Sequence, residues 1–308
     1  MKFNILISLL ITCIGCNNSI GYNLEDSDTG QQEDLIFVET GLVENNLEDS
    51  GLEPADMCNG SIVSAETAQE IIDLSTLTEA EDIYSIYYRI DNIALLFETC
   101  NDPWGMFPTT YRHITRRIIQ AIENEEINDQ EWGHRIVVDF ASRYMLNLRL
   151  ALSGDEPSYA WNQYYYLADN SDVSRARAVV VAMVAHLTLD LPYSLVAIET
   201  TEDHKDDYFV LGELMIEITP DFIEDLEMYY DADTEDLLNG FFLGDWADDI
   251  FGEDTTITLS YQTIRTKSWN NRWLLEQSWG GWIAASEIYT AFWTIDGVLA
   301  TLDATGAI

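Results

Sequence analysis

Apolar residues recur every three or four positions along most of this chain, from residue 61 to the C-terminus, which is the period of an amphipathic α-helix. Short polar breaks separate the runs, as at Asn101-Asp102-Pro103, and neither an internal repeat nor a Pro- or Gly-rich linker divides them. The pattern predicts one all-α, multi-helix domain. Only Thr255–Tyr261 alternates in the way that indicates a short strand.

The most apolar run outside the N-terminus covers residues 173–200 and predicts a buried helix at the centre of the domain. His186 and Asp190 stand four positions apart within it, so they share one helical face. Pro192 follows directly and is expected to break or kink the helix. Burial of an ionised carboxylate is costly without a partner, so Asp190 needs one.

Two interpretations of this pair remain open. In the structural one, Asp190 caps the turn that Pro192 restarts and His186 donates a hydrogen bond to it. In the functional one, His186 and Asp190 are catalytic, as a base with its orienting acid, or they are metal ligands. The chain contains no G-x-S-x-G, P-loop, G-x-G-x-x-G or H-E-x-x-H sequence that would indicate a known chemistry.

The N-terminus has the features of an export signal over residues 1–15. Lys2 provides the positive charge, and Phe3 to Ile14 form an apolar stretch too short to span a bilayer comfortably. The following Gly15-Cys16 resembles the lipobox of bacterial lipoproteins, which implies a lipid on Cys16. We therefore expect an exported protein, periplasmic or at the cell surface, that contacts the membrane through this lipid. Ordinary signal-peptide cleavage is the alternative.

A polar segment separates this signal from the helical region. Residues 17–57 contain eleven acidic residues and no Lys or Arg, a composition that cannot bury enough apolar area to become ordered. Residues 16–57 are thus predicted to be a flexible acidic tether, and residues 58–308 the helical domain. Cys58 and Cys100 are an even pair in an exported chain and predict a disulfide, with two buried free thiols as the alternative.

The charge of the chain restricts its partners. With 55 acidic against 14 basic residues, the net charge of −41 repels nucleic acid, and a nucleic-acid partner is not expected. The one basic cluster, Arg112, His113, Arg116 and Arg117, is expected to pair with acids of this chain or, alternatively, to bind an anion.

Tryptophan is concentrated in the C-terminal part, at Trp269, Trp273, Trp279, Trp282 and Trp293. Core packing is the expected use of these side chains. An interaction surface is the alternative, and it predicts an exposed aromatic patch.

Several sequence blocks carry a resemblance: FPTTYRHIT from Phe107, AHLTLDLP from Ala185 and HKDDY from His204. They are similar to the successive blocks of an uncharacterised, largely helical bacterial family, a domain of unknown function with an A-H-[IL]-N-x-D-L-P-like central motif. The resemblance covers about residues 80–275. Position by position, the residues that match are His186, Asp190, His204 and Asp207, and the resemblance implies the fold but no reaction. Thr188 replaces the usual Asn of the motif.

The His-x-x-x-Asp spacing is also similar to zinc-dependent phospholipases C and the related single-strand nucleases. Those trinuclear sites need many histidines, whereas this chain has four. A single divalent metal held by His186, Asp190, His204 and Asp207 is the metal hypothesis that remains. Two functions are thus carried forward: a binding or structural module whose protein or small-molecule partner is unknown, and a metal-dependent hydrolase that uses His186 and Asp190.

Overall fold

The computed structural model describes residues 54–243 and 261–308. Within these ranges the regular elements are all helices, joined by turns and loops, apart from an isolated bridge between Cys58 and Val63, which confirms the predicted all-α domain. The expected signal peptide, Cys16 and residues 16–53 of the expected tether lie outside the described residues. So does most of the predicted strand at 255–261, and its last residue, Tyr261, opens a helix.

The described helices follow one another with short connections. In chain order they are α2 (Pro54–Met57), α3 (Ala65–Leu74), α4 (Ile83–Cys100), η3 (Pro103–Gly105), α5 (Met106–Glu123), α6 (Gln130–Leu152), α7 (Tyr159–Ala168), α8 (Arg175–Ala185), η4 (His186–Asp190), α9 (Leu191–Ala197), η5 (Glu202–His204), α10 (Lys205–Glu217), α11 (Thr219–Tyr230), α12 (Glu235–Leu243), α14 (Tyr261–Glu276) and α15 (Gly281–Thr305).

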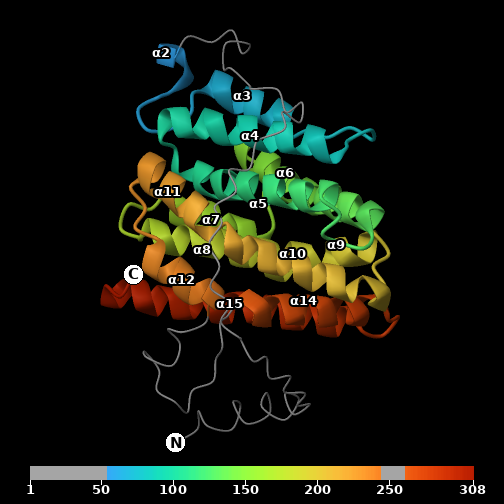
Figure 1. Ribbon diagram of the computed structural model, residues 1–308. Helices are drawn as coiled ribbons and strands as arrows, with labels where there is room; N and C mark the ends of the chain where they lie inside the picture. Colours follow the sequence, from blue (N-terminus) through green and yellow to red (C-terminus); the bar gives the residue numbers. More distant parts are fainter. Residues whose placement is uncertain (1–53, 244–260) are drawn as a thin grey trace, which may run out of the picture. The chain divides into compact units, whose positions relative to one another are not determined.

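The segments α8, η4 and α9 form one central helix, Arg175–Ala197. Contacts with α5, α6 and α7 and with α14 and α15 surround it, and it lies between α5 and the α14–α15 pair (Figure 1). The helix is long and apolar enough to cross a membrane, yet 83% of its most apolar window is buried inside the domain. It is therefore the core of the bundle, as the hydrophobic pattern predicts.

A disulfide between Cys58 and Cys100 ties the start of the domain to the last residue of α4, with 5.4 Å between the two Cα atoms. The sequence separation of 42 residues corresponds to a stabilisation of about 4 kcal/mol through restriction of the unfolded chain. The predicted pairing is confirmed. Residues 54–57, the last four of the expected tether, form helix α2, and Met57 is packed into the domain: it is buried, and its carbonyl accepts a hydrogen bond from the Thr67 hydroxyl.

The central helix passes Pro192 through a π-helical turn, η4, rather than ending before it. The Leu191 amide donates to the His186 carbonyl, five residues back. In this register the donor for the Leu187 carbonyl would be the nitrogen of Pro192, which carries no hydrogen. Ser268 of α14 satisfies that carbonyl instead, with its Oγ 2.5 Å from the oxygen. The break expected at Pro192 is thus replaced by a wider turn and a side-chain donor from another helix.

We expect Ser268→Ala to lower the free energy of unfolding by about 1–3 kcal/mol, because it leaves the buried Leu187 carbonyl without a donor. In a Pro192→Ala background, the backbone amide of residue 192 can donate to the Leu187 carbonyl. In that background Ser268→Ala should therefore lower the free energy of unfolding clearly less. Denaturant unfolding of the four proteins of this double-mutant cycle measures the difference.

Ser286→Ala, at an exposed position of α15, serves as the control and should be close to neutral. Equal costs of Ser268→Ala in both backgrounds would contradict this account of the π-helical turn.

Candidate functional site

The π-helical turn brings His186 and Asp190 into direct contact. Nδ1 of His186 lies 2.9 Å from Oδ2 of Asp190, and both residues are buried. Trp161 of α7 donates its indole N–H to the same oxygen at 2.8 Å. The carboxylate makes no helix-capping hydrogen bond. The structural interpretation was therefore right about His186 and wrong about the cap, because both identified donors to Oδ2 are side chains.

Burial decides the protonation of His186. Removal of the imidazole from water lowers its pKa below the ordinary 6.5, and the hydrogen bond to Asp190 opposes this effect only in part. Indole N–H is a donor only, so the shared Oδ2 acts as an acceptor. At neutral pH the ring is neutral, with the proton on Nδ1 directed to Asp190 and a free lone pair on Nε2.

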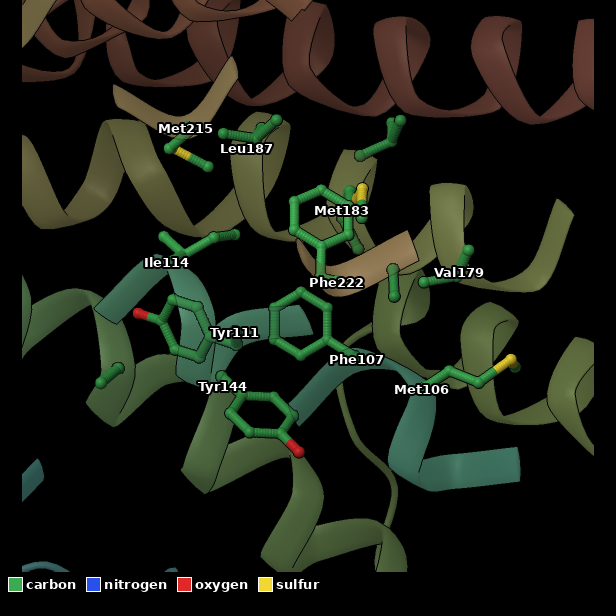
Figure 2. Packing of buried hydrophobic residues seen from close by; sticks show 14 of the residues in the cluster. Met106, Phe107, Tyr111, Ile114, Tyr144, Val179, Met183, Leu187, Met215 and Phe222 are labelled. Carbon is green, nitrogen blue, oxygen red and sulfur yellow. The ribbon is translucent and has the colours of Figure 1, made fainter. Parts of the chain in front are cut away.

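Aromatic rings on three sides hold the imidazole in one orientation. Phe140 of α6 stacks on it with 3.4 Å between ring centroids and 9° between planes. Tyr111 and Phe107 of α5 meet it edge-on, at 4.9 and 5.3 Å. Figure 2 shows Phe107 and Tyr111 grouped with Tyr144 beneath the central helix. The ring is thus fixed by packing as well as by its bond to Asp190.

The other ring nitrogen, Nε2, is buried and has no hydrogen-bond partner among the described residues. His186 is one of the residues that line a cavity of about 20 Å³, whose accessible wall is entirely apolar, so Nε2 itself does not open onto the cavity. Its lining residues come from α5, α6, the central helix, α10, α12 and α14: Phe107, Tyr111, Ile114, Phe140, Met183, His186, Leu187, Met215, Phe241 and Tyr261.

This arrangement leaves one basic acceptor unsatisfied in apolar surroundings. A buried acceptor without a donor costs about 1–3 kcal/mol, and such groups are uncommon in native proteins. π-helical turns also occur frequently at functional sites. Chemically, the pair can accept a hydrogen bond or a proton at Nε2, and the carboxylate stabilises the ring in either role.

His204 lies in a different contact set. Its Nδ1 accepts the Thr201 amide at 2.9 Å, Nε2 lies 3.2 Å from a carboxylate oxygen of Asp129, and the ring stacks on Trp132. Both ring nitrogens are therefore engaged, and the residue ties η5 to the first turn of α6.

Asp207 also serves the start of α6. Its two oxygens accept the backbone amides of Asn128 and Asp129 and the side-chain amide of Asn128, each at 2.8 Å. Across residues 54–243 and 261–308, no group of three or more His, Cys, Asp or Glu is placed to hold a metal ion. The expected metal site of His186, Asp190, His204 and Asp207 is therefore not formed. Of these four residues, only His186 and Asp190 are in contact with each other.

Three of the four residues of the basic cluster on α5, Arg112, His113 and Arg117, pair with acids of the chain itself, as expected, whereas Arg116 is exposed and lies 3.4 Å from Nδ1 of His113. Arg112 bonds Glu98 and Asp225, and His113 approaches the same Asp225 carboxylate at 2.6 Å. Arg117 pairs with Glu126. These contacts use the guanidinium groups that an anionic ligand would need.

Sequence reasoning missed Trp161 and the aromatic enclosure of His186. Trp161 stands 29 positions from Asp190, and Phe140 comes from a third helix. The richness of the Tyr159–Leu167 stretch in aromatics is the one signal that was available, and it does not say which ring reaches the carboxylate.

The neutral state of buried His186 predicts a pH effect on stability. Below about pH 6.5 the imidazole of His186 binds a proton in the unfolded chain but not in the folded protein. The free energy of unfolding therefore decreases as the pH is lowered, by at most about 1.4 kcal/mol per pH unit from this group. His186→Asn keeps a donor for Asp190 but cannot titrate. Denaturant unfolding between about pH 7.5 and about pH 5.5 should show a smaller fall in this variant.

His134→Asn, which removes an exposed histidine, is the matched control and should keep the wild-type pH dependence. The same loss of slope in both variants would assign the effect to general charge rather than to His186.

Comparison with known proteins extends the resemblance seen in the sequence blocks. Neither a curated protein nor a solved structure matches the chain. A family model matches residues 83–291, which include the π-helical turn, Trp161 and all of the residues that line the cavity. This match covers more than half of the chain, so the protein belongs to that family, the family of unknown function DUF5995.

Proposed function

We propose that this protein is a binding module of the cell envelope that holds a small apolar molecule with one hydrogen-bond donor beside His186. The observation that carries the proposal is the Nε2 atom of His186, a buried acceptor with no partner in the described part of the chain, on a residue that lines an apolar cavity. Once the lining moves enough to open the cavity to Nε2, a ligand hydroxyl would satisfy this atom while the apolar body of the ligand occupies the cavity.

Water is a poor occupant of the same space. A cavity of about 20 Å³ has room for one water molecule, but a buried water normally makes two to four hydrogen bonds. The wall is apolar, so a water molecule there would satisfy His186 and leave its own remaining groups unpaired. A ligand with a single donor has no such deficit.

The cavity must enlarge to take such a ligand, and its lining allows this. Met183 and Met215 have long, unbranched side chains that repack easily. Phe241 closes the cavity from α12, a helix of nine residues. Movement of these side chains can widen the space while the Asp190–His186–Trp161 hydrogen bonds stay intact.

The geometry gives less support to the alternative, a metal-dependent hydrolase. Its four expected ligands fall into separate contact sets, because His204 and Asp207 are committed to the start of α6. His186 already directs one nitrogen to Asp190. Binding of a ligand donor to Nε2 needs only His186 and Asp190, which are in contact in the structure.

Phenol and anisole provide a direct test, since they have similar size and differ in the hydroxyl donor. We expect phenol to raise the melting temperature in a saturable way and anisole to do so far less. At ten times its dissociation constant the ligand should add about 1.4 kcal/mol to the free energy of unfolding. Met215→Ala, which enlarges the cavity, should tighten phenol binding.

His186→Asn should abolish the preference for phenol, whereas His134→Asn should keep it. Equal binding of phenol and anisole, or an unchanged preference in His186→Asn, would refute the role of Nε2.

The proposed location rests on the N-terminal residues. An apolar signal that ends in Gly15-Cys16, an acidic segment after it and a disulfide in the domain all fit a lipid-anchored exported protein. Mass spectrometry of the membrane fraction should find an N-terminal peptide that begins at Cys16 and carries acyl chains. Cys16→Ser should release the protein from membranes, and unchanged membrane association would exclude this anchor.

A further inference from the structure

Three tryptophans near the turn between α14 and α15 are exposed: Trp273 (49%), Trp279 (54%) and Trp282 (74%). Trp269 of α14 is buried instead. The five C-terminal tryptophans therefore do not all pack in the core. Trp273 and Trp279 face each other edge to face, with 6.1 Å between ring centroids and 76° between planes. Both rings are about half exposed, so the pair, which we call the aromatic corner, presents aromatic surface to solvent.

Trp273 also lines a solvent-open hollow of about 470 Å³, which we call the Trp273 hollow. The turn that follows α14 lies at the end of the bundle where α9 also ends (Figure 1). The lining residues come from the end of α9, from η5 and from α14: Val196, Glu199, Thr200, Thr201, Glu202, Arg272, Trp273 and Glu276. This volume suits a small molecule.

The charge of the Trp273 hollow is negative. It is lined by three carboxylates and one guanidinium. Arg272 is buried, and its guanidinium pairs with Glu202 at 2.8 Å and lies 3.8 Å from Glu276. One base against three acids leaves a net charge of −2 on the lining, beside an exposed aromatic corner.

From this combination we infer that the Trp273 hollow binds a small organic cation of the quaternary ammonium class. Indole faces attract cations, most strongly those that give up their hydration easily, and carboxylates add long-range attraction. The protein already pairs these groups at this end of α14, where the Arg272 guanidinium lies 4.4 Å from the Trp269 ring centre.

The aromatic corner distinguishes this ligand class from others. An inorganic divalent ion prefers converging oxygen ligands, and indoles supply none. An anion would meet the net negative lining. A neutral apolar molecule would use the indole faces but gain nothing from Glu199, Glu202 and Glu276.

Choline and its neutral carbon isostere, 3,3-dimethyl-1-butanol, test the inference with the full-length protein by titration calorimetry. Choline should bind at least about ten-fold more tightly than the isostere. Trp273→Leu should weaken choline binding about ten-fold, and Glu276→Gln should weaken it about three-fold and reduce its salt dependence.

Trp282→Leu removes the most exposed tryptophan, which does not line the Trp273 hollow, and is the matched control with unchanged affinity. Circular dichroism should show the same fold in every variant. Equal affinity for choline and the isostere, equal losses in Trp273→Leu and Trp282→Leu, or no measurable choline binding would each overturn the inference. The phenol test depends on none of these residues, so the two proposals fail independently.

Discussion

The backbone amide hydrogen that Pro192 lacks determines the geometry of the central helix. Pro192 cannot donate to a helical carbonyl, yet it lies inside the helix that the rest of the bundle surrounds. The chain resolves the conflict with a π-helical turn, and Ser268 of α14 satisfies the carbonyl of Leu187. The same wide turn carries His186 and Asp190. The backbone constraint and the candidate site are therefore one feature of the fold.

Asp190 links this turn to the surrounding helices. A buried carboxylate is tolerated when donors surround it, and here His186 and Trp161 both donate to Oδ2. Because the bond to Asp190 fixes the Nδ1 edge of the imidazole and stacking on Phe140 fixes its plane, Nε2 is left as an oriented acceptor. The arrangement resembles the support that a second residue gives to a histidine base in many enzymes, and the accessible wall of the cavity beside it is apolar.

The excess of acidic residues has different consequences at α5 and at the Trp273 hollow. On α5 the arginines are neutralised by Glu98, Asp225 and Glu126, so the basic cluster holds helices together. At the Trp273 hollow, three carboxylates outnumber Arg272 beside exposed indoles. The first arrangement pairs charges within the domain, and the second leaves a net negative charge on the lining of a solvent-open hollow.

Local patterns in the sequence were sufficient for the all-α fold, the buried central helix and the contact between His186 and Asp190, because helical period and spacing act over a few residues. The Cys58–Cys100 pairing followed instead from the number of cysteines, since only these two remain beyond the N-terminal segment. Only the tertiary structure decided that Trp161 meets Asp190, that Nε2 has no partner in the described domain and that His204 and Asp207 serve the start of α6. It also decided which tryptophans face solvent. These features depend on residues far apart in the chain, and packing of the helices, which no local period encodes, sets their distances.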